Sequence, residues 1–208
     1  MKRRPAKPAL AFFLLCLGGT ASAATATPPP HPPSRVLTSC SMCHSTHGSD
    51  PRFGFIPRLA HQNQVYIIEQ LKAFRDGSRS DPPAVMYMWP VSEALNNHEI
   101  VAVARWYASQ PAPRPQPGGQ LTPAGKAIFQ KGILKQDVPA CMSCHGPVAA
   151  GSGIFPRLAG QNTEYLEEQL RFFKSGVRHD KNADIMHMIA IHLTNRQIRA
   201  VAEYLTTL

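Results

Sequence analysis

Apolar residues recur along this chain at helical spacing, and the recurrence is interrupted by glycine and proline. Residues 63–76 carry such a stripe, which stops at Gly77. Another segment opens at Asn96 with Glu99 three residues later, the capping-box pattern of a helix N-terminus. Sustained alternation of apolar and polar residues is not found in any segment. The pattern predicts an all-α chain without a substantial sheet.

The same helix signals return in the second half. Thr194 with Gln197 repeats the capping box, and residues 122–131 form a further predicted helix with proline at its favoured first turn. The helix predicted over residues 122–131 has no clear counterpart ahead of Cys40, where residues 34–39 could form at most one or two helical turns.

These parallels reflect an internal duplication. The stretch at 56–63 matches the stretch at 155–162, where both read Pro-Arg-Leu-Ala-x-Gln-Asn after one apolar residue. Further landmarks match in the same order, namely Tyr66 with Tyr165, Gln70 with Gln169, Phe74 with Phe173, Arg79 with Arg178, Leu95 with Leu193 and Ile100 with Ile198. The Pro/Gly-rich residues 111–119 cannot continue a helix. We therefore expect a first domain over 34–110, a linker over 111–119 and a second domain over 120–208.

The amino terminus is typical of an export signal. Four basic residues precede a short apolar run over 9–19, and Ala21-Ser22-Ala23 gives a small-x-small cleavage pattern. We expect residues 1–23 to be removed, although cleavage after Ala26 and a retained anchor stay open. Residues 24–33 read as a Pro-rich tether without core-forming residues. The export signal predicts a periplasmic protein.

The charge is only moderately informative. The formal net charge is +9, and subtracting the four cations of the export signal leaves about +5. This basic balance gives no argument for binding nucleic acid. It permits docking to an acidic partner protein, or peripheral contact with a membrane surface.

Two pentapeptides carry the chemistry. Cys-x-x-Cys-His occurs once in each half, and it uses four of the five cysteines. At this spacing two thiols bond to one porphyrin edge, and the next residue supplies an axial imidazole to the iron. The predicted haem-binding residues are Cys40, Cys43, His44, Cys141, Cys144 and His145. Two covalently bound haem c groups are the predicted cofactors.

Cys-x-x-Cys also occurs in redox dithiols and in zinc sites. A redox dithiol is expected in a βαβ pattern, which this chain lacks, and a zinc site would not require a histidine after each second cysteine. The two-haem interpretation explains both cysteines and the histidine of each motif.

The sixth iron ligand decides between electron transfer and chemistry, because a methionine there closes the site. Each half carries a methionine pair ahead of its last helix. Met88 lies seven residues before Leu95, and Met186 lies seven before Leu193, so the register predicts Met88 and Met186 as ligands. The alternatives are Met86, Met188, His187 and His192.

Taken together, the haem motifs, the Pro-Arg-Leu-Ala-x-Gln stretches with their tyrosines, the Gly-x-Arg turns and the methionine segments resemble the di-haem class I cytochromes c. The resemblance is closest to the cytochrome c4 family and covers residues 34–208. It implies a tandem pair of all-α haem domains that exchange electrons. It also implies that Pro57 and Pro156 present their carbonyl groups to the proximal histidines. The two halves differ in one respect: the first half has one residue more than the second between its arginine, Arg79, and its methionine segment.

The expected function is electron carriage, not catalysis. The resemblance implies transfer between a respiratory or dehydrogenase complex and a terminal oxidase, with redox proteins as the partners. A haem-bearing subunit of one periplasmic dehydrogenase is the main alternative. A di-haem peroxidase is less favoured, because no group of carboxylate, histidine and arginine residues marks a peroxide site.

Overall fold

The computed structural model describes residues 31–208, so the predicted export signal and residues 24–30 of the predicted tether lie outside it. Helices make up the regular secondary structure of this region. The elements are α1 (Ser34–His44), α2 (Gln64–Arg75), the π-helical turn η1 (Ala84–Met88), α3 (Trp89–Glu93), α4 (Asn97–Ala108), α5 (Thr122–Lys131), the short 3-10 turn η2 (Leu134–Gln136), α6 (Met142–His145), α7 (Thr163–Ser175), α8 (Ala183–Ala190) and α9 (Asn195–Leu205). Within residues 31–208 the β-structure consists of two isolated bridges. The all-α prediction is confirmed.

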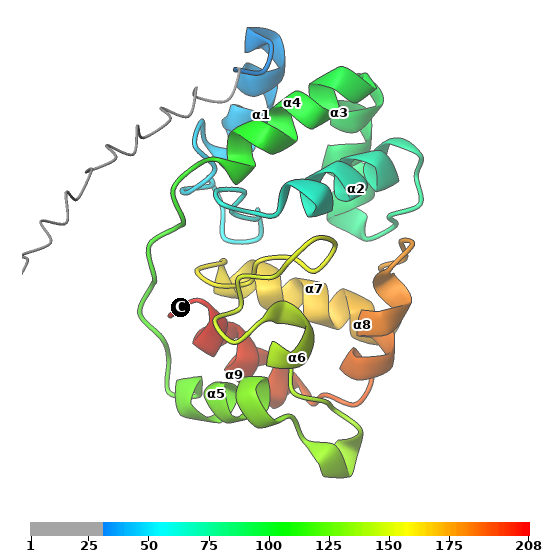
Figure 1. Cartoon of the computed structure of the whole chain (residues 1–208). Helices are drawn as coiled ribbons and strands as arrows, with labels where there is room; N and C mark the ends of the chain where they lie inside the picture. The colour runs from blue at the N-terminus through cyan, green and yellow to red at the C-terminus, as the bar shows by residue number, and fades with distance from the viewer. Residues whose placement is uncertain (1–30) are drawn as a thin grey trace, which may run out of the picture.

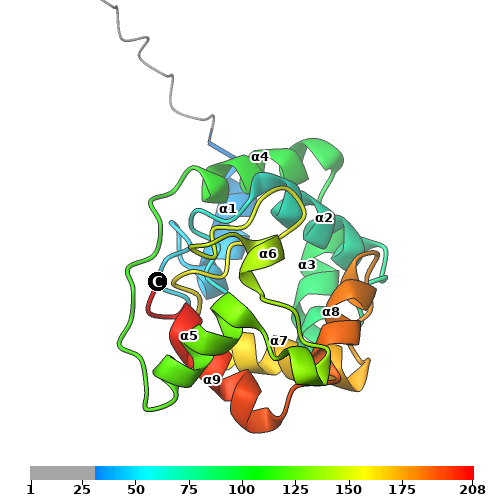
Figure 2. The same cartoon turned by 60° about the horizontal axis from the view of Figure 1, so that its bottom comes forward.

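Two bodies lie one above the other in Figure 1, with α1 to α4 in the upper body and α5 to α9 in the lower one. In the first half α2 packs against α4, and in the second half α5 and α7 both pack against α9. The segment between α4 and α5 runs along one side of the molecule, and it can also be followed in the turned view of Figure 2. It contains the prolines of the predicted linker, and the domain boundaries stay a prediction.

The two halves have equivalent hydrophobic cores. Positions that match in the duplicated sequence are buried in both copies: Phe74 and Phe173, Ala84 and Ala183, Leu95 and Leu193, Ile100 and Ile198, Val103 and Val201, and Ala104 and Ala202. Each of these cores is small, as expected for domains that depend on a bound group for part of their apolar mass.

Both predicted capping boxes are confirmed. Asn96 accepts from the Glu99 backbone and the Glu99 carboxylate accepts from the Asn96 backbone at the start of α4. Thr194 and Gln197 make the same reciprocal pair at the start of α9. These bonds satisfy backbone N–H groups that lack partners in the first turn of a helix. They explain why the last helix of each half begins where it does.

The two haem motifs sit in different local structures. Residues 34–39 are helical, within the one or two turns expected, but they continue without a break into the motif as the single helix α1. In the second half Gly132, at a φ of 68°, ends α5, and the motif lies on the separate short helix α6. Residues 34–44 contain neither glycine nor proline, so nothing interrupts α1.

The extra residue of the first half forms the π-helical turn η1. The matching alanines Ala84 and Ala183 are both buried, and Met88 follows Ala84 by four residues whereas Met186 follows Ala183 by three. A π-helical turn holds one residue more than an α-helical turn. The insertion therefore leaves Met88 against the core of the first half, as Met186 packs against that of the second.

Among the described residues no helix is long and apolar enough to cross a bilayer.

Candidate haem centres

The first haem motif occupies the last turn of α1. Cys40 is partly buried, Cys43 is exposed, and the His44 ring is buried with its Nδ1 atom 2.9 Å from the carbonyl oxygen of Pro57. Burial lowers the pKa of His44, against a smaller raising effect of the Pro57 carbonyl. The ring is therefore neutral at pH 7. Since a carbonyl can only accept, the proton resides on Nδ1, and Nε2 keeps a free lone pair for iron.

The second motif repeats this geometry on α6. The Nδ1 atom of His145 lies 3.1 Å from the carbonyl oxygen of Pro156, and burial lowers the pKa of this histidine as well. Burial also raises the pKa of the Cys141 thiol to about 11, and the same cause raises the pKa of Cys40 to about 11. These sulfurs are thus neutral thiols, and the thioethers that they form with haem are neutral as well.

A cavity of about 450 Å³ is lined by residues of both halves. This volume falls in the range of cofactor pockets, about 300–1,000 Å³. All the predicted haem-binding side chains line it, namely Cys40, Cys43, His44, Met88, Cys141, Cys144, His145 and Met186. The remaining lining is largely aliphatic and aromatic. Thiols, a neutral imidazole and a thioether around an apolar cavity form the donor set that fits c-type haem.

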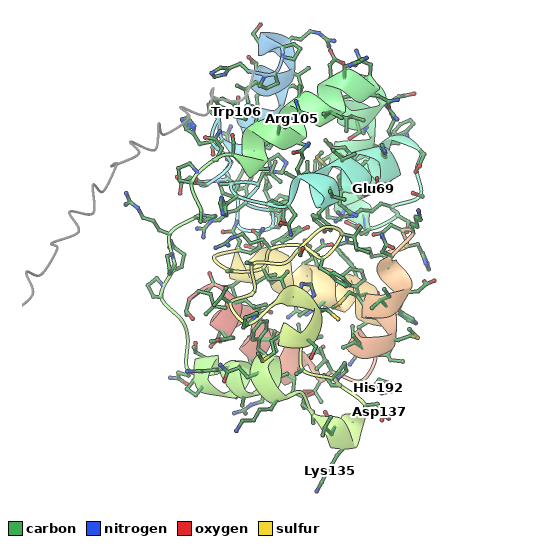
Figure 3. The ribbon with its side chains drawn as sticks, viewed as in Figure 1. Glu69, Arg105, Trp106, Lys135, Asp137 and His192 are labelled. Atoms are coloured by element: carbon green, nitrogen blue, oxygen red, sulfur yellow. The ribbon has the colours of Figure 1, made fainter. Side chains whose placement is uncertain are left out.

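The four candidate methionines fall into two groups. Met88 and Met186 line the cavity, whereas the side chains of Met86 and Met188 are 65% and 60% exposed and do not. The Nδ1 atom of His187 lies 2.7 Å from the carbonyl oxygen of Phe173 and the ring does not line the cavity. Similarly, His192 is exposed at the outer end of the second half, as Figure 3 shows. This arrangement supports the register that pairs Met88 with Met186.

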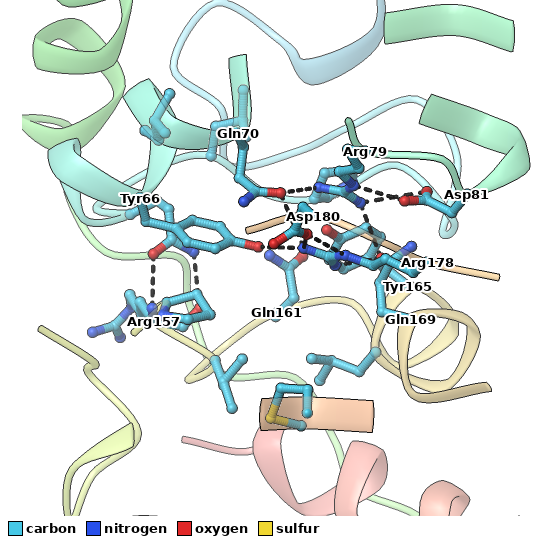
Figure 4. A pocket seen from close by; sticks show the side chains of 18 of the residues that line it. Tyr66, Gln70, Arg79, Asp81, Arg157, Gln161, Tyr165, Gln169, Arg178 and Asp180 are labelled. Carbon is cyan, nitrogen blue, oxygen red and sulfur yellow. Dashed lines mark hydrogen bonds and ion pairs between the residues drawn. The ribbon is translucent and has the colours of Figure 1, made fainter. Parts of the chain in front are cut away.

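Two buried arginines join the halves at the cavity (Figure 4). Arg79 donates to Gln70 at 2.6 Å and to Gln169 of the other half at 2.9 Å. Arg178 donates to the same two amide oxygens, at 2.6 Å to Gln169 and 3.0 Å to Gln70. Each guanidinium also lies over an aromatic ring of its own half, within 4.6 Å of the ring centroid. Sequence reasoning noted these four residues only as repeat landmarks and missed the network.

A carboxylate balances each of these buried charges. Arg79 pairs with Asp81 at 2.7 Å, and Arg178 pairs with Asp180 at 3.2 Å. Burial by itself would raise the pKa of Asp81, but Arg79, with a further contribution from Arg178, outweighs it and holds that pKa below its usual value. The Arg79–Asp81 pair is therefore ionised and neutral overall at pH 7.

We expect Asp81→Asn to destabilise the protein by about 3 kcal/mol at pH 7, because it leaves the Arg79 charge buried without its partner. Since the folded-state pKa of Asp81 is depressed, its contribution is complete above the unfolded-state pKa of about 3.9 and is lost as the pH falls through the folded-state value. The difference in free energy of unfolding between the parent and Asp81→Asn should therefore become smaller below about pH 4. Urea unfolding at pH 7 and at pH 3 measures this.

The matched control is Lys72→Gln, which removes the exposed Lys72–Glu69 pair. An exposed pair contributes about 0–1 kcal/mol, so this variant should behave like the parent at both pH values. Equal losses in Asp81→Asn and Lys72→Gln would contradict a buried ion pair at Asp81.

Known proteins resemble this chain over most of its length. The family model described as Cytochrome c matches residues 123–208. The chain is 41% identical over 197 residues to cytochrome c-552 of Acidithiobacillus ferridurans, which covers 94% of this chain and 84% of that protein. It is 36% identical over 172 residues to the thiosulfate dehydrogenase electron acceptor of Thiomonas intermedia, covering 80% of this chain and 77% of that protein.

A solved structure has the same fold. Cytochrome c4 of Acidithiobacillus ferrooxidans superposes with a TM-score of 0.77 at 40% identity, covering 82% of this chain and 99% of that chain. Fold and site together define a di-haem c-type cytochrome of class I, an electron-transfer protein and not an enzyme. Two covalently bound haem c groups are its cofactors. Within that class, the chain belongs to the cytochrome c4 family.

Proposed function

We propose that this chain carries electrons in the periplasm from a dehydrogenase or quinol-oxidising complex to a membrane-bound terminal oxidase. His44 with Met88 and His145 with Met186 are the proposed axial ligands, and the cysteines of the two motifs form the thioether links. The observation that carries the proposal is the pair of buried histidines whose Nδ1 atoms are engaged by proline carbonyls. Each shares the cavity with one inward methionine.

The protein's own groups set the properties of each centre. When bound, haem supplies a one-electron iron couple. The carbonyl of Pro57 or Pro156 fixes the histidine tautomer and makes the ring a stronger donor, which favours the oxidised state. The methionine sulfur is a soft, neutral donor that favours the reduced state. The apolar lining keeps water away from the iron. The surroundings therefore rearrange little when the charge on the iron changes, and electron exchange is easier.

A closed coordination site distinguishes a carrier from a catalyst. With histidine and methionine both in place, no position is free for a diatomic ligand or peroxide. We expect the reduced protein to bind carbon monoxide slowly or not at all near neutral pH, as followed by the absorbance of its haem. Rapid, stoichiometric carbon monoxide uptake at either centre would contradict the proposal and favour a peroxidase or sensor.

A periplasmic dehydrogenase is one of the two proposed electron donors. The relative from Thiomonas intermedia, named as a thiosulfate dehydrogenase electron acceptor, supports this class of partner. The same relative also supports the second candidate, a subunit permanently bound to one dehydrogenase. Isolation from the native host distinguishes them. A carrier is recovered as a free species that exchanges electrons with both a dehydrogenase and an oxidase, whereas a subunit is recovered in a stoichiometric complex.

Periplasmic location and processing belong to the same proposal. Residues 1–23 act as the export signal, and residues 24–33 tether the folded part. Residues 34–110 and 120–208 form the two haem domains, joined by residues 111–119. Intact mass of the mature protein, which reports the cleavage site and the haem number together, tests this assignment.

A further inference from the structure

Backbone groups next to Pro57 are held by side chains of the opposite half. The Asn162 side chain donates to the carbonyl oxygen of Ile56 at 2.8 Å. The Gln161 side chain accepts from the Arg58 N–H at 2.8 Å and donates to the Arg58 carbonyl oxygen at 3.0 Å. One amide thus engages both polar backbone groups of Arg58, as a neighbouring strand would.

The second half is held in the same way by the first. The Asn63 side chain donates to the carbonyl oxygen of Phe155 at 2.6 Å. The Gln62 side chain accepts from the Arg157 N–H at 2.7 Å and donates to the Arg157 carbonyl oxygen at 2.9 Å. Gln62 and Gln161 are only 6% and 5% exposed. Water therefore competes little for these bonds, and losing one leaves a buried polar group without a partner.

Between the held groups lies the carbonyl that meets the proximal histidine. Proline has no N–H, so the carbonyl is the only polar backbone group of Pro57. It lies 2.9 Å from the Nδ1 atom of His44, while both of its chain neighbours are bonded to the opposite half. In the second half Pro156 stands in the same relation to His145, at 3.1 Å. The position of each carbonyl therefore depends on the domain across the interface.

We infer that Gln161 and Gln62 are positioning residues that act crosswise. Gln161, in the second half, fixes the hydrogen bond of the first haem's proximal histidine, and Gln62, in the first half, fixes that of the second. The inference rests on the proposed ligands His44 and His145. A firm Nδ1–H to carbonyl bond strengthens the histidine as a donor and favours oxidised iron. Loosening the segment weakens that bond and raises the potential of one haem.

The test compares Gln161→Leu and Gln62→Leu in the full-length holoprotein by redox titration. In Gln161→Leu the reduced-to-oxidised ratio of the first haem at fixed potential should rise about threefold, which is about 28 mV for a one-electron couple. The second haem should not change. Gln62→Leu should give the mirror result. Met88→Ala and Met186→Ala assign the two titration steps, since each should displace one of them.

A contact elsewhere between the halves supplies the matched control. The Ser80 hydroxyl donates to the carbonyl oxygen of Val177 at 2.8 Å and accepts from the His179 N–H at 3.0 Å. Ser80→Ala loosens the contact without touching either proline segment, so it should leave both potentials unchanged. If Gln161→Leu does not fold, Gln161→Met keeps the length of the side chain without a charge, removes both bonds to Arg58 and should shift the same haem in the same direction.

Three results would overturn the inference: a shift in the haem of the substituted half, an equal shift in both haems, or no shift. An effect of Ser80→Ala as large as that of Gln161→Leu would also do so. Failure of the proposed function reads differently. In that case the mass of the parent protein would correspond to fewer than two haems per chain, or the methionine variants would displace neither titration step.

Discussion

A protein that carries Cys141→Ala together with Cys144→Ala should retain one haem and lose the fold of its second half. The haem occupies apolar space in a small core, and removing it leaves a void larger than that of any single side chain. Truncating a buried Phe or Trp to Ala already costs about 3–5 kcal/mol. The loss here should exceed about 5 kcal/mol, which is comparable to the whole stability of a small domain. Intact mass under denaturing conditions and far-ultraviolet circular dichroism measure both effects.

Ser143→Ala is the matched control for this prediction, because Ser143 lies inside the same motif with an exposed side chain. That variant should keep two haems and the parent's helicity. Two haems in the double cysteine variant, or haem that acidic organic solvent extracts from the parent, would contradict covalent attachment at this motif.

Replacing Met186 with alanine should convert a closed centre into an open one. The oxidised protein should lose about half of its weak far-red absorbance, the band that reports sulfur bound to ferric haem. One potential should fall by about 100 mV or more, because axial ligands set haem potentials over a range of about 0.8 V. Carbon monoxide should then bind rapidly to half of the haem. Absorbance during a redox titration and after mixing with carbon monoxide measures all three.

Met188→Ala provides the comparison, since Met188 is two residues away and 60% exposed. It should leave the far-red band and both potentials near their parent values. If Met188→Ala produces the losses and Met186→Ala does not, the ligand register in the second half is wrong by two residues.

Local patterns carried most of what could be predicted from the sequence. The capping boxes at Asn96 and Thr194 involve residues three apart, so the sequence alone defines them. The haem motifs are equally local. The methionines that line the cavity could be predicted from the duplication. Leu95 and Leu193 are equivalent positions in the two copies, and the residue seven positions before each leucine is a methionine.

Contacts between distant segments could not be predicted in this way. Gln70 receives a hydrogen bond from Arg178, 108 residues further along the chain, and no spacing rule connects them. The same holds for Gln161 and Arg58, which are 103 residues apart. The extra residue after Arg79 was visible in the sequence, but its conformation as the π-helical turn η1 depends on packing that keeps both Ala84 and Met88 against the core.

Residue pairs that exchange roles across the two halves, such as Gln161 with Arg58 and Gln62 with Arg157, form an isologous interface. In a dimer of identical domains, a two-fold axis would produce the same crossed contacts. In a homodimer, however, every substitution occurs twice and the two centres stay equal. Fusion into one chain removes that restriction. The insertion in η1 is present in one copy only, and asymmetry of this kind lets the two centres differ in reduction potential.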